Sequence, residues 1–144
     1  MAVTHKLYGP IVTNIYNGTV DLGAHTFKVA LMSSAHTLNQ DHENWADVSA
    51  NEISSTGDYT AGGITLAIAS SQMTYATRVT SVICSSETVF STSGTISANY
   101  AVVYGSTNNK LVSCVDFGGA EASVDGEYKI TWTDSKLKTV TVSA

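Results

Sequence analysis

Apolar and polar residues alternate through most of the second half of the chain, which is the pattern of half-buried β-strands. Two runs rich in β-branched and aromatic residues, Gly94–Tyr104 and Lys110–Phe117, flank the turn Gly105–Asn109. Gly, Ser and Asn punctuate such runs where a chain reverses. This spacing predicts an antiparallel hairpin. The Gly118-Gly119 pair then reads as a loop that leads to a further strand at Glu127–Trp132.

Shorter alternating segments predict more strands on both sides of this hairpin. Their boundaries from sequence are Thr26–Met32, Ile64–Ile68, Thr80–Cys84, a short ambiguous run at Glu87–Phe90, and Leu137–Val142, which we expect to form a final hairpin with Glu127–Trp132. Seven to nine short strands with frequent turns are typical of sandwiches and barrels. The fold class that we expect is therefore mainly β: a single-domain antiparallel β-sandwich or barrel with one short N-terminal helix.

The helix is predicted at Pro10–Asn17. Proline suits the first helical turn, and Asn17-Gly18 is a typical stop. Val12, Ile15 and Tyr16 lie at positions i, i+3 and i+4, so they form one apolar stripe. A helix this short needs a packing partner. A further helical turn is expected around Asp41–Trp45.

Composition excludes several classes of protein. The chain has 144 residues, which is the length of a single domain. It has 13% charged residues and a formal net charge of −5. Nucleic-acid binding needs clustered Lys and Arg, which are absent, and no apolar run is long enough to cross a membrane. The first residues lack the basic and apolar regions of a signal peptide. We therefore expect no nucleic acid, no membrane and a cytoplasmic site of synthesis.

The residues with chemical potential do not form a recognisable site. Cys84 and Cys114 lie in apolar strand patterns, so we expect two buried, reduced thiols without a neighbouring His. His36, Asp41, His42 and Glu43 have metal-ligand chemistry but no standard zinc spacing, so a solvated polar loop is expected. The carboxylates Asp116, Glu121, Asp125 and Glu127 look like turn residues. We expect no enzymatic activity, no cofactor and no metal.

Aromatic residues leave a sugar-binding surface open as an alternative. Packing in the core and in loops is the plainer interpretation, because several of them lie inside strong strand patterns. The residues concerned are Trp45, Tyr59, Tyr75, Tyr100, Tyr104 and Trp132.

Several segments resemble small virion proteins of tailed bacteriophages. They are Met1–Pro10, Phe27–Ser34, Asn39–Asp41, Asn51-Glu52, Tyr59–Gly63, Tyr100–Tyr104 and Val115–Gly119, in the same order along nearly the whole chain. The chain departs from this family at Asn14–Asp21, where a longer and more charged helical piece is expected. Members of the family are often described as head decoration, or cement, proteins.

This resemblance implies a protein that binds the outer surface of the major capsid protein lattice and stabilises the head. It would be made in the host cytoplasm and then reside on the capsid of the virion, as a homo-oligomer such as a trimer. The first candidate contact is an N-terminal arm within residues 1–9 that adds a strand to a neighbour's sheet. Its residues are Ala2, Val3, Thr4, His5, Lys6, Leu7 and Tyr8. The alternative is that this arm is the first strand of the chain's own sheet.

Two other functions remain open at this point. A tail structural protein would build a tube or ring through head-to-tail interfaces. A sugar- or receptor-binding β module would need an exposed aromatic patch.

Overall fold

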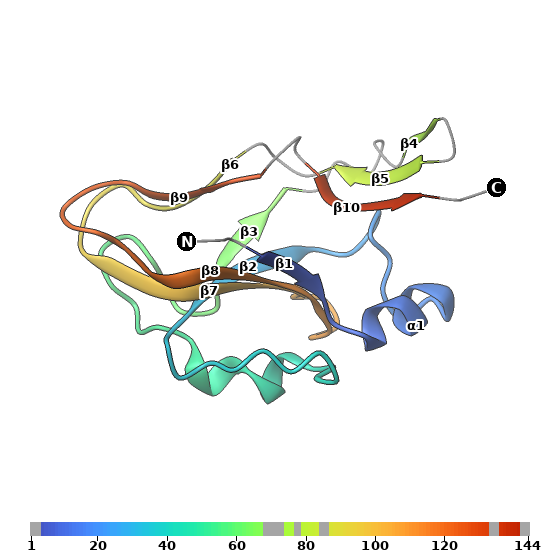
Figure 1. Cartoon of the computed structure of the whole chain (residues 1–144), viewed down its shortest axis with the longest axis horizontal. Coiled ribbons are helices and arrows are strands. Elements are labelled where there is room, and N and C mark those ends of the chain that lie inside the picture. The colour runs from blue at the N-terminus through green and yellow to red at the C-terminus, as the bar shows by residue number, and fades with distance from the viewer. Residues whose placement is uncertain (1–3, 68–73, 77–78, 84–86, 133–135, 142–144) are drawn as a thin grey trace.

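The computed structural model describes residues 4–67, 74–76, 79–83, 87–132 and 136–141 (Figure 1), with side chains described for 4–67 and 87–132. It is a mainly β structure of antiparallel strands with one α-helix. The described strands do not close into a barrel. The elements are β1 (Thr4–Leu7), α1 (Pro10–Tyr16), β2 (Phe27–Met32), the 3-10 helices η1 (Trp45–Asp47) and η2 (Ser49–Asn51), β3 (Ile64–Leu66), β4 (Thr74–Ala76), β5 (Val79–Ile83), β6 (Glu87–Ser91), β7 (Ile96–Gly105), β8 (Leu111–Ser123), β9 (Tyr128–Thr131) and β10 (Lys136–Thr141).

The largest sheet has five strands in the order β1-β8-β7-β2-β3. The predicted hairpin is confirmed, since β7 and β8 pair antiparallel and Gly105 N donates to Lys110 O across the turn. β1 pairs with β8 from Thr4↔Asp116 to Leu7↔Ser113. The N-terminal segment is therefore an edge strand of the chain's own sheet, which is the second of the two alternatives for the arm.

Two smaller sheets complete the described strands, and they correct one expectation. β9 pairs with β6, and β10 pairs with β5, which also pairs with β4. The expected hairpin between Glu127–Trp132 and Leu137–Val142 is therefore wrong, because each of these strands pairs with an earlier segment. Alternation along a strand specifies which face is buried but not which strand lies beside it.

The five-stranded sheet is covered on both faces, so its central strands are buried on both sides. β2 has five of its six residues buried, with only Lys28 at intermediate exposure. In Figure 1 the β6–β9 ribbon lies over one face, and the segment with η1 and η2 runs beneath the other. The first core contains Phe27, Val29, Leu31, Phe90, Phe117, Tyr128 and Trp132 among others. The second contains Tyr8, Ala30, Met32, Val48, Val102, Tyr104, Leu111 and Cys114.

The Gly118-Gly119 pair lies inside β8, not in a loop after it. Ala98 pairs with Glu121 and Tyr100 pairs with Asp116, so β8 carries three extra residues between these positions. Gly118 has φ 77°, and its N–H donates to the Asp116 carboxylate at 2.8 Å. Such a bulge bends a strand. The bend carries the end of β8 toward β9, which places the two strands on opposite sides of a cleft.

The helical turn expected at Asp41–Trp45 is observed slightly later, as η1 and η2. The Asn44 side chain accepts from the backbone of Asp47, and the Asp47 carboxylate accepts from Asn44 N at 2.9 Å, which forms a capping box. None of the described helices is long and apolar enough to cross a membrane.

Candidate docking surface and cleft

The apolar stripe of helix α1 points to solvent. Val12, Ile15 and Tyr16 are 48%, 40% and 87% exposed. They are three of the five large hydrophobic side chains that are exposed in the described part of the chain; the other two, Val89 and Val124, lie elsewhere. The helix boundaries agree with the sequence prediction, but the stripe does not face the core as its spacing suggests. We call these three residues the α1 stripe.

A polar contact explains this orientation. Ile11 and Asn14 are the buried residues of α1. Ile11 enters the first core, and Asn14 donates to the Glu43 carboxylate at 3.2 Å. Glu43 also pairs with Lys110 at 2.8 Å, and these two partners, Lys110 first, lower the pKa of Glu43. The helix is therefore fixed by one apolar residue and one amide, and the α1 stripe stays outside.

No charged residue lies in α1, whose sequence is Pro-Ile-Val-Thr-Asn-Ile-Tyr. Depletion of charge and enrichment of Tyr characterise the centres of protein–protein interfaces. An exposed Tyr at 87% is also the most typical hot-spot residue of the three. The α1 stripe is thus a candidate contact for another protein.

The predicted N-terminal contact residues divide into four groups. Ala2 and Val3 lie outside the described residues. Thr4, His5 and Lys6 are exposed on β1, and Leu7 is half-buried against the first core. Tyr8 is fully buried in the second core, so its prediction as a contact residue does not hold: its ring packs under the sheet and offers no surface to a partner.

Among the described strands, β1 has a strand neighbour on one side only. Tyr8 N donates to Val112 O at 3.1 Å, so the main-chain groups of the adjacent Leu7 point outward by the alternation of antiparallel pairs. Gln40 Nε2 donates to that outward Leu7 carbonyl at 2.8 Å. The segment around Gln40 therefore covers the end of the edge near α1. We call the exposed part, Thr4–Lys6, the β1 edge.

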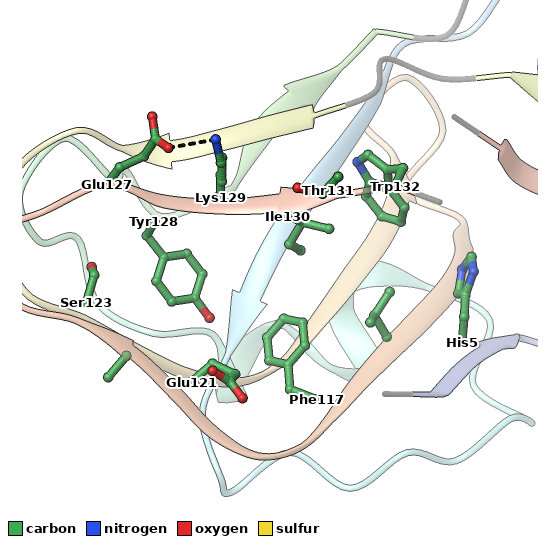
Figure 2. Close-up of a pocket in the computed structure, with 12 residues that line it drawn as sticks. His5, Phe117, Glu121, Ser123, Glu127, Tyr128, Lys129, Ile130, Thr131 and Trp132 are labelled. Carbon is green, nitrogen blue, oxygen red and sulfur yellow. Dashed lines mark ion pairs between the residues drawn. The ribbon is translucent and has the colours of Figure 1, made fainter. Parts of the chain in front are cut away.

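A cleft of about 670 Å³ opens between the bent end of β8 and strand β9 (Figure 2). Phe117 and Tyr128 point into it, and Trp132 lies at one end near His5, with ring centroids 6.1 Å apart. Trp132 Nε1 donates to Thr88 Oγ1 at 2.9 Å, which fixes the indole. The other residues that line it are Val115, Glu121, Ala122, Ser123, Glu127, Lys129, Ile130 and Thr131.

The charges at the cleft are unequal. Lys129 pairs with Glu127 at 3.0 Å and with Glu87 at 3.4 Å. Glu121 has no ion pair within the described residues. Burial, and secondarily the Glu121 charge, raise the pKa of Tyr128 to about 12, which places this carboxylate close to the phenol. The sequence pattern around Glu121 and Glu127 is typical of turns, and it does not reveal that the bulge in β8 brings both residues to one cleft.

His36 is buried, in contrast to the solvated loop expected from sequence. It is 2% exposed, its ring lies edge-on to Tyr100, and its Nε2 is 3.9 Å from Cys114 Sγ. Cys114 is a buried free thiol as predicted, but the expectation that it lacks a neighbouring His is wrong. Cys84 lies outside the described residues. Across residues 4–67, 74–76, 79–83, 87–132 and 136–141, no group of three or more His, Cys, Asp or Glu could hold a metal ion.

The aromatic residues considered for sugar binding are mostly inside the structure. Tyr59, Tyr104 and Trp132 are buried, and Trp45 stacks on Tyr104 with ring centroids 4.1 Å apart. Tyr100 is half-buried, and the side chain of Tyr75 lies outside the described ones. These residues form core contacts, and none of those described is exposed.

In comparisons with known proteins, no family model, no curated protein and no solved structure matches the chain.

Proposed function

We propose that this chain is a bacteriophage capsid decoration protein that binds the outside of the major capsid protein lattice through the α1 stripe. The observation that carries the proposal is the exposed, uncharged stripe of Val12, Ile15 and Tyr16 on a helix anchored by Ile11 and Asn14. The resemblance of the sequence to small virion proteins of tailed phages supports the choice of partner.

The segments that carry the resemblance hold the fold together. The Tyr59 hydroxyl donates to Glu52 Oε1 at 2.6 Å and accepts from Leu31 N at 3.0 Å, and Tyr104 donates to Gly62 O at 2.6 Å. The departure from the family, Asn14–Asp21, begins in α1. A shared scaffold with a divergent contact helix is what we expect when related proteins bind different lattices.

Interface size argues for a composite contact. A stable interface buries roughly 800 Å² per partner, which three side chains cannot supply. The β1 edge leads into α1 along the chain and can add main-chain hydrogen bonds to a neighbour's strand. The chain then lies across a seam between capsid subunits.

Cementing requires only modest affinity from each copy. Many copies on one lattice act together, so separating two capsid subunits also requires breaking the contacts of every copy that spans their seam. The protein would reside on the capsid surface, with the major capsid protein as its partner. Oligomers of the chain itself, such as trimers, would increase this effect.

The experiment uses particles of the phage that encodes the chain, with its gene deleted, and purified protein added back. Saturable binding and release of DNA at a higher temperature than from bare particles are the expected results. Binding without a change in heat release would refute cementing, and no binding would refute the capsid as the partner.

A tail structural protein is the competing function, and one further measurement separates it. Negative-stain images of the purified protein at high concentration should show no rings or tubes. If regular rings form and Tyr16→Asp abolishes them, the α1 stripe is a subunit interface and the tail function is preferred.

A further inference from the structure

The cleft between β8 and β9 has the chemistry of a cation site. Its floor is aromatic, with Phe117, Tyr128 and Trp132 all 6–7% exposed, and its rim carries the exposed carboxylates of Glu121 and Glu127 against the single ammonium of Lys129. Because Lys129 is shared between Glu127 and Glu87, it does not neutralise Glu121. The rim is therefore negative in excess.

A hydrogen-bond acceptor in the cleft is also unused. Ser123 Oγ is buried and has no hydrogen-bond partner within the described residues. Buried hydroxyl groups without a partner are uncommon and call for an explanation, such as a missing ligand. In Figure 2 Ser123 lies on β8 on the same side of the cleft as Glu121, below Glu127.

We propose that this cleft binds an arginine side chain presented by a partner polypeptide. A guanidinium is planar, so it stacks on aromatic rings while its N–H groups reach a carboxylate and a hydroxyl in different directions. Glu121 is the carboxylate, Ser123 Oγ is the second acceptor, and the rings of Phe117 and Tyr128 provide the apolar floor. The volume of about 670 Å³ accommodates the side chain with its flanking backbone.

Other ligand classes fit this cleft less well. An anion would be repelled by the two rim carboxylates. A sugar carries no positive charge to pair with Glu121, and the N–H of Trp132 is already donated to Thr88. A lysine ammonium offers a point charge and lacks the plane that stacks on Phe117 and Tyr128. This inference does not depend on the capsid as partner, because the site lies on β8 and β9, away from the residues of the α1 stripe.

The test uses the intact, isotopically labelled protein and NMR. The chain has two tryptophans, so two indole N–H signals are expected, and Trp132→Phe assigns them. The probe is the blocked peptide Gly-Arg-Gly, and the matched neutral probe is Gly-Gln-Gly. Titration with the arginine peptide should shift the Trp132 signal and leave Trp45 in place, while the glutamine peptide shifts neither.

Glu121→Gln should raise the dissociation constant of the arginine peptide about three- to fivefold, as expected for loss of one exposed charge pair. Asp41→Asn, which removes an exposed carboxylate from a loop outside the cleft, is the control and should leave the constant unchanged. The backbone spectrum shows that both variants are folded. An equal response to the two peptides, an equal response to the free diamine putrescine, or an unchanged constant in Glu121→Gln would overturn the proposal.

Discussion

The imidazole Nε2 of His36 lies 3.9 Å from the sulfur of Cys114, and both residues are buried. Such a pair invites comparison with the activated thiols of catalytic sites. Burial, however, raises the pKa of Cys114 to about 12 and lowers the pKa of His36, so both groups are neutral near pH 7. The thiolate is the reactive form of cysteine, so this pair packs the core and does not attack substrates.

The first prediction concerns the reactivity of Cys114. In a Cys84→Ser background, a thiol reagent at pH 8 should label the native protein at least about a thousandfold more slowly than the protein in denaturant, since labelling has to wait for rare unfolding. The measurement is the rate of colour release from an aromatic disulfide reagent. Labelling within seconds under native conditions would show that the thiol is accessible.

The second prediction concerns stability in mild acid. Burial, and then the nearby His42, lower the pKa of His36 below its unfolded value of 6.5. The unfolded chain therefore binds the proton more tightly than the folded chain. The contribution of His36 to folding stability is therefore fully present above pH 6.5. It is lost as the pH falls below 6.5 toward the lowered pKa of His36 in the folded protein. The check is the urea midpoint between pH 7.5 and pH 5.

His36→Phe is the comparison variant, because phenylalanine keeps an aromatic ring against Tyr100 without titrating. The other described histidines, His5, His25 and His42, are present in both proteins. The fall in midpoint between pH 7.5 and 5 should be smaller in His36→Phe than in the wild type. Equal slopes in the two proteins would assign the acid sensitivity to other groups.

The third prediction concerns the hydroxyl group of Tyr59, which accepts from Leu31 N and donates to Glu52. Tyr59→Phe leaves a buried N–H and a carboxylate without this partner, which costs about 1–3 kcal/mol of folding free energy. Tyr16→Phe makes the same chemical change at an 87% exposed ring and should cost almost nothing. Thermal or urea unfolding of both variants provides the measurement. Similar losses in both would mean that the buried network contributes little.

The fourth prediction compares two glycines with the same backbone angle. Gly18 and Gly63 both have φ 78°, a region that costs a non-glycine residue about 1–2 kcal/mol. A Cβ at Gly18 meets nothing within 4 Å, whereas at Gly63 it would lie 2.4 Å from Val29 O. Gly18→Ala should therefore lose about 1 kcal/mol. Gly63→Ala should lower the free energy of unfolding clearly more, because β2 must shift to make room for the Cβ. Equal losses of the two variants in urea unfolding would contradict the close approach at Gly63.

Local pattern predicted the elements better than their pairing. The helix, the β7–β8 hairpin and β2 follow from stop signals and alternation within a few residues. The pairing partner of β9 does not follow from such local signals, because the alternation along β9 is the same whichever strand lies beside it. The bulge at Gly118 does not follow from the local sequence either, because a Gly-Gly pair suits a loop and a bent strand equally well.

The candidate surfaces were harder to predict for a related reason. The spacing of the α1 stripe suggests a packing face, but the hydrogen bond of Asn14 to Glu43, 29 residues away, orients the helix with the stripe toward solvent. The arm was identified by position, and its Tyr8 proved buried. The cleft depends on the bend in β8, which brings Glu121 opposite β9, and the sequence does not specify this bend.

The central claim is that the α1 stripe contacts the major capsid protein, and site-specific photo-crosslinking tests it most directly. A benzophenone amino acid replaces Tyr16 in one protein and Val124, which is 76% exposed and directly follows β8, in the control. Both proteins are added to particles that lack the chain and are then irradiated. The account predicts an adduct with the major capsid protein from position 16 and none from position 124. An adduct from position 124 alone, or from neither position on particles that have bound the protein, would contradict it.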